Sequence, residues 1–327
     1  MKYRILGKTG YKISEISYGS WSLGADWGDV TREQSLATLN SAIDSGVNFI
    51  DTADVYGDGK SEQIIGEFLK MRSERIYVAT KAGRRLNPHS AEGYTKKNLN
   101  TFVERSLKNL GVATLDLLQL HCPPTPVYYT KSVFDALEEM VQKKKIRHYG
   151  VSVEKVEEGL KALEYPGLAT VQIIFNMFRQ RPAELFFKEA MRKKIGIIVR
   201  VPLASGLLSG KMTNKTVFSK NDHRNYNREG KFFDVGETFA GVDLNTGLAA
   251  VEKLKKIKPQ QYSMPQFALK WILMNKAIST VIPGGKRPEQ IGDNTKASAL
   301  PPLSKKIMKE VEKIYSVEIQ PEVHHRW

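Results

Sequence analysis

The sequence has 327 residues, 50 Lys and Arg against 35 Asp and Glu, and a single cysteine, Cys122. This length exceeds that of a disulfide-stapled mini-domain, and one cysteine excludes an intrachain disulfide and a cysteine-based metal site. No apolar run approaches the roughly 20 residues of a membrane span, and the N-terminal stretch does not resemble a signal peptide. We therefore expect a cytoplasmic globular chain without a membrane partner. The net charge of +15 leaves nucleic acid, anionic lipid and a phosphorylated small molecule open as partners.

Short apolar runs alternate with amphipathic stretches along the chain. Ahead of them, Tyr3–Leu6 and Tyr11–Ile13 flank Gly7–Gly10, a pattern that indicates a β-hairpin. The near-continuous apolar character of the later runs favours parallel pairing with both faces covered. Eight such strands are predicted, at 15–18, 47–51, 76–80, 115–120, 147–151, 171–174, 196–199 and 278–282.

Stretches of helical periodicity separate these strands. The first follows Thr31, a predicted N-cap, and ends near Gly46, which is typical of the residue after a helix end. Ser61 begins another helix, and a third ends at Gly111. Strands that alternate with helices in this way predict an α/β fold, a (β/α)8 TIM barrel that takes up residues 1–327 as a single domain.

Three further segments complete the expected fold. The N-terminal hairpin would plug the bottom of the barrel. Residues 204–241, called the long loop below, are polar and contain glycines, which indicates a functional loop in a compact domain. After Pro301 and Pro302 comes one more helical pattern and a C-terminal tail.

Polar residues with complementary chemistry follow three successive predicted strands. Asp51 ends one strand, Lys81 the next and His121 the third, while Tyr56 lies on the loop after the first. Because the C-terminal strand ends of a barrel converge on one face, we expect the four side chains to cluster. A neighbouring ammonium lowers the pKa of a tyrosine hydroxyl, which then exchanges a proton with a carbonyl oxygen that becomes an alcohol. Asp51 would orient Lys81, and His121 would hydrogen-bond the carbonyl oxygen.

Each of these residues also has a purely structural interpretation. A strand-end Asp or Lys often belongs to a structural ion pair, and a single His often serves packing or capping. Metal binding is not predicted, because the six histidines show no ligand spacing. What favours a functional site is that four compatible residues fall at the ends of three successive strands.

Asp51–Gly57, followed by Ser61 and Glu62, resembles the first signature of the aldo-keto reductases. Thr80–Lys81 and Leu118–His121 are similar to that family's lysine and histidine motifs, in the same order. The resemblance covers essentially the whole chain and is to the branch with bacterial aldo-keto reductases and potassium-channel β-subunits. It implies the barrel fold and NADPH/NADP+ bound without a Rossmann glycine motif, with NAD(H) as the alternative. It also implies a catalytic tetrad of Asp51, Tyr56, Lys81 and His121.

The resemblance further implies a set of cofactor-binding residues. Ser152 and Gln172 match residues that contact the nicotinamide carboxamide, although Val153 stands where an asparagine often follows the serine. Arg200 occupies the position of an aromatic residue that commonly stacks on the nicotinamide, and a planar guanidinium can also stack. The following segment, which includes the stretch similar to the family's pyrophosphate-contacting loop, contributes Pro202, Leu203, Gly206, Leu208, Ser209 and Lys211.

The adenosine end decides between NADP and NAD. After Gly284, Lys286 and Arg287 would clamp a 2′-phosphate, and Gln290 and Asn294 resemble adenine contacts. The alternative is a solvated basic pair that precedes a helix. For the substrate pocket, Trp21 resembles a family residue that lines it, and Trp27 and Tyr128 are further candidates. All three aromatic residues have the alternative of being loop anchors.

The resemblance implies an NADP(H)-dependent oxidoreductase that interconverts an aldehyde or ketone and an alcohol by hydride transfer, with Tyr56 as general acid/base. The expected partner is a small-molecule carbonyl or alcohol substrate. Two alternatives are a redox-sensing binding subunit and a sugar or alcohol dehydrogenase that runs mainly in the oxidative direction. Nucleic-acid binding is not expected, because basic and aromatic residues do not interleave. The surplus charge is instead assigned to helix ends and to a nucleotide clamp of Lys81, Arg200, Lys211, Lys286 and Arg287.

Overall fold

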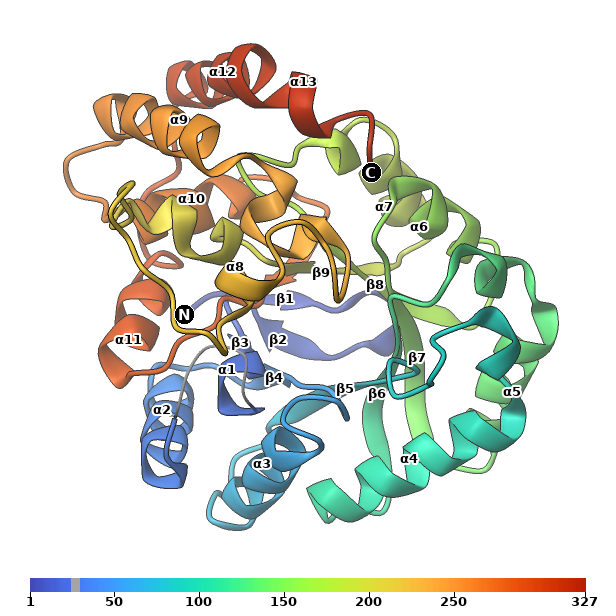
Figure 1. Cartoon of the computed structure of the whole chain (residues 1–327). Helices are drawn as coiled ribbons and strands as arrows, with labels where there is room; N and C mark the ends of the chain where they lie inside the picture. The colour runs from blue at the N-terminus through green and yellow to red at the C-terminus, as the bar shows by residue number, and fades with distance from the viewer. Residues whose placement is uncertain (25–29) are drawn as a thin grey trace.

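The computed structural model describes residues 1–24 and 30–327, and this part of the chain forms a barrel of strands ringed by helices (Figure 1).

 In the described residues, strands β3 to β10 form one sheet in chain order, and each strand is parallel to its neighbours. The strands are β3 (Tyr18–Gly19), β4 (Phe49–Asp51), β5 (Tyr77–Ala82), β6 (Leu115–His121), β7 (Ile146–Ser152), β8 (Leu168–Ile174), β9 (Gly196–Arg200) and β10 (Ile278–Val281).

The barrel closes between its first and last strands. The backbone N–H of Ser17 donates to Val281 O at 2.8 Å, and the N–H of Val281 donates to Glu15 O at 3.0 Å. The strand expected at 15–18 is therefore divided: residues 15–17 bond to β10, and β3 itself pairs with β4. The (β/α)8 barrel predicted from the sequence is confirmed.

Helices follow the strands around the outside. Thr31 caps the first long helix, its side chain accepting from Gln34 N, and Gly111 ends another with a positive φ of 65°. The helices are α1 (Trp21–Gly24), α2 (Arg32–Asp44), α3 (Lys60–Lys70), α4 (Lys96–Leu110), α5 (Lys131–Gln142), α6 (Val156–Ala162), α7 (Phe186–Arg192), α8 (His223–Tyr226), α9 (Leu244–Ile257), α10 (Met264–Leu273), α11 (Pro288–Lys296), α12 (Lys305–Ile314) and α13 (Gln320–Val323). In the described part of the chain, no helix combines the length and the apolar character that a membrane crossing needs.

The N-terminal hairpin consists of β1 (Tyr3–Ile5) and β2 (Lys12–Ser14), which pair antiparallel. Leu6 and Ile13 are fully buried in an apolar cluster with side chains of the barrel strands. Gly7 approaches β9 so closely that a Cβ there would lie 2.1 Å from Gly196 N. The hairpin thus plugs one end of the barrel, in the middle of the ring of strands in Figure 1.

The long loop contains short helical turns rather than extended regular structure. They include 3₁₀ turns at Ala204–Ser209, Val235–Glu237 and Phe239–Gly241, and the helix α8. After α11, the tail runs through α12, a π-helical turn at Tyr315–Ile319 and α13. In Figure 1 α12 lies beside α9, and α13 leads to a C-terminus that is drawn near α7.

Candidate active site

The barrel interior changes from apolar to polar along each strand. Because side chains two residues apart share a face of a strand, the apolar cluster at the hairpin end continues into a polar layer at the C-terminal ends. Phe49, Ala79, Leu117 and Ile198 belong to the apolar cluster. Two residues further along the same strands stand Asp51, Lys81, Gln119 and Arg200.

Lys81 is the centre of this polar layer. Its Nζ donates to Asp51 Oδ2 at 2.5 Å, to the backbone oxygen of Thr52 at 2.9 Å and to Tyr56 Oη at 3.4 Å. Both Lys81 and Asp51 are almost fully buried. Burial opposes the charge on Lys81, yet Asp51 and Tyr56 together outweigh it and raise the pKa of the lysine. The ammonium is therefore retained and directed at the tyrosine hydroxyl.

Tyr56 lies between a cation and aromatic side chains. Burial raises the pKa of Tyr56 above its ordinary value, while the Lys81 ammonium acts in the opposite direction. The sequence predicted a net lowering; the net direction differs because desolvation of the phenolate outweighs the field of the ammonium. Tyr56 is consequently protonated at neutral pH, the form in which a tyrosine donates a proton.

His121 ends β6 next to this tyrosine. The two ring centroids are 5.9 Å apart in an edge-to-face arrangement. Burial, reinforced by the cations Arg84 and Lys81, lowers the pKa of His121 well below its ordinary value. The imidazole is therefore neutral, and its Nδ1 has no hydrogen-bond partner within the described residues. A neutral imidazole has one N–H to donate to a carbonyl oxygen.

Asp51 is held by amides as well as by Lys81. Gln119 Nε2 donates to its Oδ1 at 3.3 Å, and Gln172 Nε2 donates to the same oxygen at 2.7 Å. Gln119 was missed in the sequence, although it stands two residues before His121 and so shares its face of β6. The four residues expected to cluster are thus brought together, and both glutamines bond to Asp51.

A model of the Aldo/keto reductase family matches residues 15–316 of the chain. The chain belongs to this family. It is 30% identical to the aldo-keto reductase YhdN of Bacillus subtilis, over 89% of this chain and 87% of that protein. It is 28% identical to a probable voltage-gated potassium channel subunit beta of Arabidopsis thaliana, over 96% of each.

Two further relatives have names that specify a cofactor or a substrate. The chain is 28% identical to the aldo-keto reductase yakc [NADP(+)] of Schizosaccharomyces pombe, over 86% of this chain and 83% of that protein. The solved glycerol dehydrogenase AKR11B4 from Gluconobacter oxydans superposes with a TM-score of 0.80 at 27% identity, over 97% of this chain and 96% of that one. The resemblance seen in the sequence is confirmed, including the branch with bacterial enzymes and channel subunits.

In this aldo/keto reductase, the side chains expected at the nicotinamide are in contact with protein groups. Ser152 is fully buried, and its Oγ accepts from Cys122 Sγ at 3.4 Å. The amide nitrogen of Gln172 is directed at Asp51. Arg200 Nη2 donates to Val153 O at 3.0 Å and to Glu154 Oε2 at 2.7 Å. The guanidinium of Arg200, which was expected to stack on the nicotinamide, is therefore held through hydrogen bonds from Nη2.

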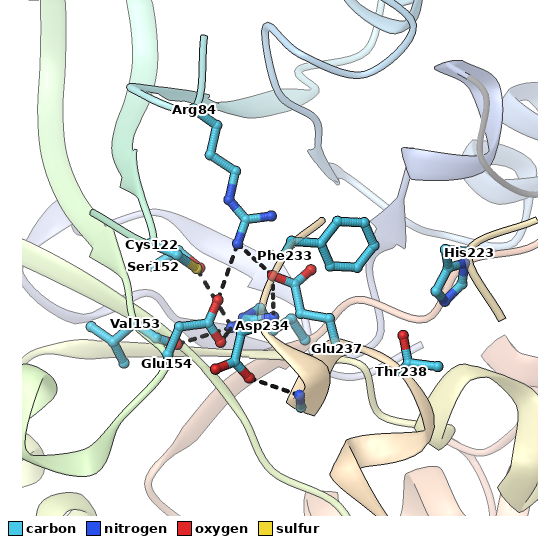
Figure 2. Close-up of polar contacts among 12 residues, drawn as sticks. Arg84, Cys122, Ser152, Val153, Glu154, His223, Phe233, Asp234, Glu237 and Thr238 are labelled. Carbon is cyan, nitrogen blue, oxygen red and sulfur yellow. Dashed lines mark hydrogen bonds and ion pairs between the residues drawn. The ribbon is translucent and has the colours of Figure 1, made fainter. Parts of the chain in front are cut away.

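Arg200 belongs to a larger ionic cluster. Figure 2 shows Arg84 of this cluster pointing toward the carboxylates of Glu154 and Glu237. Arg84 Nη2 contacts Glu154 Oε1 at 3.0 Å and Glu237 Oε1 at 2.5 Å, and Arg200 Nη1 lies 3.6 Å from Glu237 Oε1. Burial raises the pKa of Glu154 to about 7, whereas Arg84 and Arg200 overcome burial and lower the pKa of Glu237 to about 2. No periodic pattern in the sequence marks this cluster, because Glu237 comes from an irregular segment. Cys122, Glu154 and Glu237 lie close together, but two guanidinium groups occupy the place of a cation.

The rest of the expected cofactor residues lie at 202–211, where the chain enters the long loop, and in the turn before α11 and α11 itself. Gly206 has a φ of +92°, and Pro202 and Leu208 are buried, whereas Leu203 and Ser209 are half-buried and Lys211 is exposed. Gln290 Oε1 accepts from the backbone N–H groups of Lys286 and Arg287, at 2.8 and 3.2 Å, and Asn294 Nδ2 donates to Gly284 O at 3.4 Å. The two residues expected at the adenine therefore organise the backbone that carries the basic pair.

Two assignments change in the structure. Tyr128 is fully buried and its hydroxyl donates to Ser152 O at 3.2 Å, so this placement is structural and does not favour a substrate contact. Lys81 and Arg200 are buried against carboxylates. Of the five cations expected in the nucleotide clamp, Lys211 and Arg287 are therefore exposed and Lys286 is half-buried. Trp27 lies outside the described residues.

Trp21 stands beside Tyr56 as expected of a pocket wall. Its ring is stacked 6.0 Å from that of Tyr56, and it also contacts His223, at 4.7 Å, and Phe233, at 5.9 Å. His223 and Phe233, both labelled in Figure 2, come from the long loop, so their contacts with Trp21 bring this loop next to Tyr56. These two aromatic residues were not identified from the sequence, because nothing local marks their distant partners.

Proposed function

We propose that this aldo/keto reductase is an NADP(H)-dependent oxidoreductase that interconverts an aldehyde or ketone and an alcohol, with Tyr56 as general acid/base. The observation that carries the proposal is the position of Lys81 Nζ, shared between Asp51 at 2.5 Å and Tyr56 Oη at 3.4 Å. An ammonium fixed there stabilises the phenolate that forms when the tyrosine gives up its proton. A bare structural ion pair would not need a tyrosine hydroxyl as third partner.

The proposed roles follow from the protonation states. In the reductive direction, protonated Tyr56 donates its hydroxyl proton to the substrate oxygen, and Lys81 stabilises the resulting phenolate. Neutral His121 donates a hydrogen bond to the same oxygen and orients it. Asp51, held by Gln119 and Gln172, keeps Lys81 charged and in place. In the oxidative direction Tyr56 withdraws the proton from the alcohol.

The residues present fit a dinucleotide phosphate. Gly206 is in a left-handed conformation that brings backbone close to a ligand, Ser209 and Lys211 follow it, and Lys286 and Arg287 precede the N-terminus of α11. When bound, NADP(H) supplies or accepts the hydride. Ser152 and Gln172 would hold its carboxamide, and Arg200 would lie against the nicotinamide ring. The name of the related yakc enzyme specifies NADP(+), which supports the choice over NAD(H).

The test is NADPH- and NADP+-linked turnover on a set of aldehydes, ketones, aldoses and alcohols, with wild type and Tyr56→Phe. We expect Tyr56→Phe to bind NADPH with an unchanged Kd while turnover falls by at least about 100-fold. Tyr149→Phe is the matched control, because it removes a hydroxyl that donates to Glu138 Oε1 at 2.7 Å outside the site. A fully active Tyr56→Phe variant would defeat the assignment.

A second candidate is a redox-sensing binding subunit, which the relation to a probable potassium channel subunit supports. The tetrad serves both functions, so its presence does not separate them. Turnover on the substrate set, compared with co-purification of a membrane partner from the native host, distinguishes the two. The direction of the reaction, including a dehydrogenase role, follows from the ratio of kcat/KM values measured each way.

A further inference from the structure

Trp327 packs into the long loop from the tail. Its side chain is 4% exposed, and its Nε1 donates to Asp234 Oδ1 at 3.0 Å. The ring lies directly against loop backbone: a Cβ added to Gly241 would be 2.3 Å from Trp327 Cη2, and one on Gly236 would be 3.1 Å from Trp327 Cε2. Only glycine leaves space for the indole at Gly241, which also has a φ of +79°.

Arg179 packs over the indole ring and also bonds to backbone oxygens of the barrel loops and of the long loop. Its guanidinium carbon is 3.7 Å from the ring centroid of Trp327. Its Nη1 donates to Ala240 O at 3.3 Å, and its Nη2 donates to Glu154 O at 3.2 Å. Trp327 and Arg179 together therefore connect the long loop to the loop that follows β7 in the barrel.

The loop segment that Trp327 contacts, residues 234–241, also includes Glu237 of the ionic cluster. Asp234 Oδ1 accepts both from Trp327 Nε1 and from Gly236 N, at 2.7 Å, so one oxygen joins the tail to the turn that ends at Glu237. Glu237 then contacts Arg84, as Figure 2 shows, and Arg200. Residues 234–241 are thus fixed by Trp327 on one side and by the two arginines on the other.

We propose that Trp327 is a positioning residue for residues 234–241 and, through them, for retention of the cofactor. The step to the cofactor rests on the proposed function, since the long loop includes the residues assigned to the pyrophosphate. Without the indole, Asp234 loses a donor, Arg179 loses its stacking partner and Glu237 is no longer held against Arg84 and Arg200. The loop then opens more often and the dinucleotide leaves faster.

The first measurement is amide hydrogen exchange of residues 234–241 in the protein without added cofactor. Trp327→Ala is expected to raise exchange there at least tenfold, and Trp327→Phe, which keeps a ring but not the N–H, to raise it less. Peptides from β4 to β8 serve as the internal reference. The control variant is Tyr262→Phe, which removes the hydroxyl of another buried aromatic residue, one that donates to Pro301 O. Unchanged exchange at 234–241, or an equal rise in the barrel strands, would overturn the proposal.

The second measurement is the NADPH dissociation rate, followed by stopped-flow fluorescence. Trp327→Ala is expected to raise it at least fivefold and to raise KM for NADPH, with KM for the carbonyl substrate within twofold of wild type. A faster-exchanging loop with an unchanged dissociation rate overturns the role in cofactor retention. A wild-type protein that does not bind NADPH defeats the proposed function and this retention role together, whereas the exchange result still decides whether Trp327 positions the loop.

Discussion

Arg200 donates through Nη2 to the backbone oxygen of Val153 at 3.0 Å, so the two residues that the resemblance marks as unusual at the expected nicotinamide site are in contact. The same nitrogen reaches Glu154, the residue after Val153, at 2.7 Å. A guanidinium has five donors in one plane, and an aromatic ring at position 200 would offer none of them. The guanidinium of Arg200 is instead held by Glu154 and Glu237, at the position where the resemblance leads us to expect an aromatic ring.

Replacing Arg200 by leucine should destabilise the protein. The change leaves Glu154 with Arg84 as its remaining cationic partner in a largely buried place, and we expect a loss of about 3 kcal/mol in the free energy of unfolding. Arg200→Leu combined with Glu154→Gln should recover more than half of that loss, because the buried charge is removed as well. Urea unfolding of the single and double variants measures both values. A double variant that is no more stable than Arg200→Leu would contradict this account.

The barrel and its tetrad were predictable because their signals are local and periodic. Asp51, Lys81 and His121 follow strands that the apolar pattern identifies, and barrel topology alone brings strand ends together. The contacts of the long loop have no such signal. Glu237 meets Arg84 across 153 positions, and Trp327 meets Asp234 across 93, through turns whose side chains follow no period. The direction of the pKa shift of Tyr56 could not be predicted from the sequence either, because residue spacing does not show how deeply a side chain is buried.

Asp54 should make the stability of the protein depend on pH. It is fully buried, and neither of its carboxylate oxygens has a hydrogen-bond partner among the residues described. Burial and the neighbouring Glu62 raise its pKa to about 7, against the smaller opposing effects of Arg85 and Arg105. A carboxyl whose pKa is higher in the folded state stabilises that state below the unfolded pKa, near 4, and loses this contribution as the pH rises to about 7.

We therefore expect the free energy of unfolding to fall between pH 4 and pH 7 by as much as about 4 kcal/mol from this group, before other titrations are counted. Asp54→Asn should flatten that part of the profile, because an amide has no charge to desolvate. Denaturant unfolding at half-unit pH steps gives the comparison. Parallel profiles for wild type and Asp54→Asn would show that the carboxyl is not buried in this way.

Gly57 should be essential for the position of Tyr56. It has a φ of +59°, and a Cβ there would lie 2.3 Å from Gly24 O, so any other residue displaces the backbone next to the tyrosine. We expect Gly57→Ala to lower kcat by on the order of 100-fold, since a shift of about 1 Å at a reacting group has that effect. Gly10→Ala is the matched control: its φ is +71°, but an added Cβ has nothing within 4 Å.

Both glycine variants carry the cost of a left-handed alanine, which is roughly 1 kcal/mol. The difference between them therefore isolates the contact with Gly24. Steady-state kinetics and unfolding free energies of the two variants should separate, with Gly10→Ala keeping wild-type kcat. Equal kinetics for both would mean that the loop around Tyr56 adapts to the added methyl group.

Lys286 and Arg287 should discriminate NADPH from NADH. Gln290 holds the backbone N–H groups of both residues, so the pair is presented in a fixed place at the start of α11. Hydrogen bonds between charged groups contribute about 1.5–3 kcal/mol, which corresponds to roughly 10- to 100-fold in affinity. We expect Lys286→Ala with Arg287→Ala to raise KM for NADPH by that factor and KM for NADH by less than about twofold.

Lys296→Ala is the control for this pair, because Lys296 is an exposed cation at the other end of the same helix. It changes the net charge without removing a donor from the turn before α11, and it should leave the ratio of the two KM values unchanged. The 2′-phosphate is the group that NADPH has and NADH lacks, so only a specific contact to it alters that ratio. If the double variant raised both KM values equally, the basic pair would be acting as general surface charge. Any preference for NADPH over NADH would then depend on other residues.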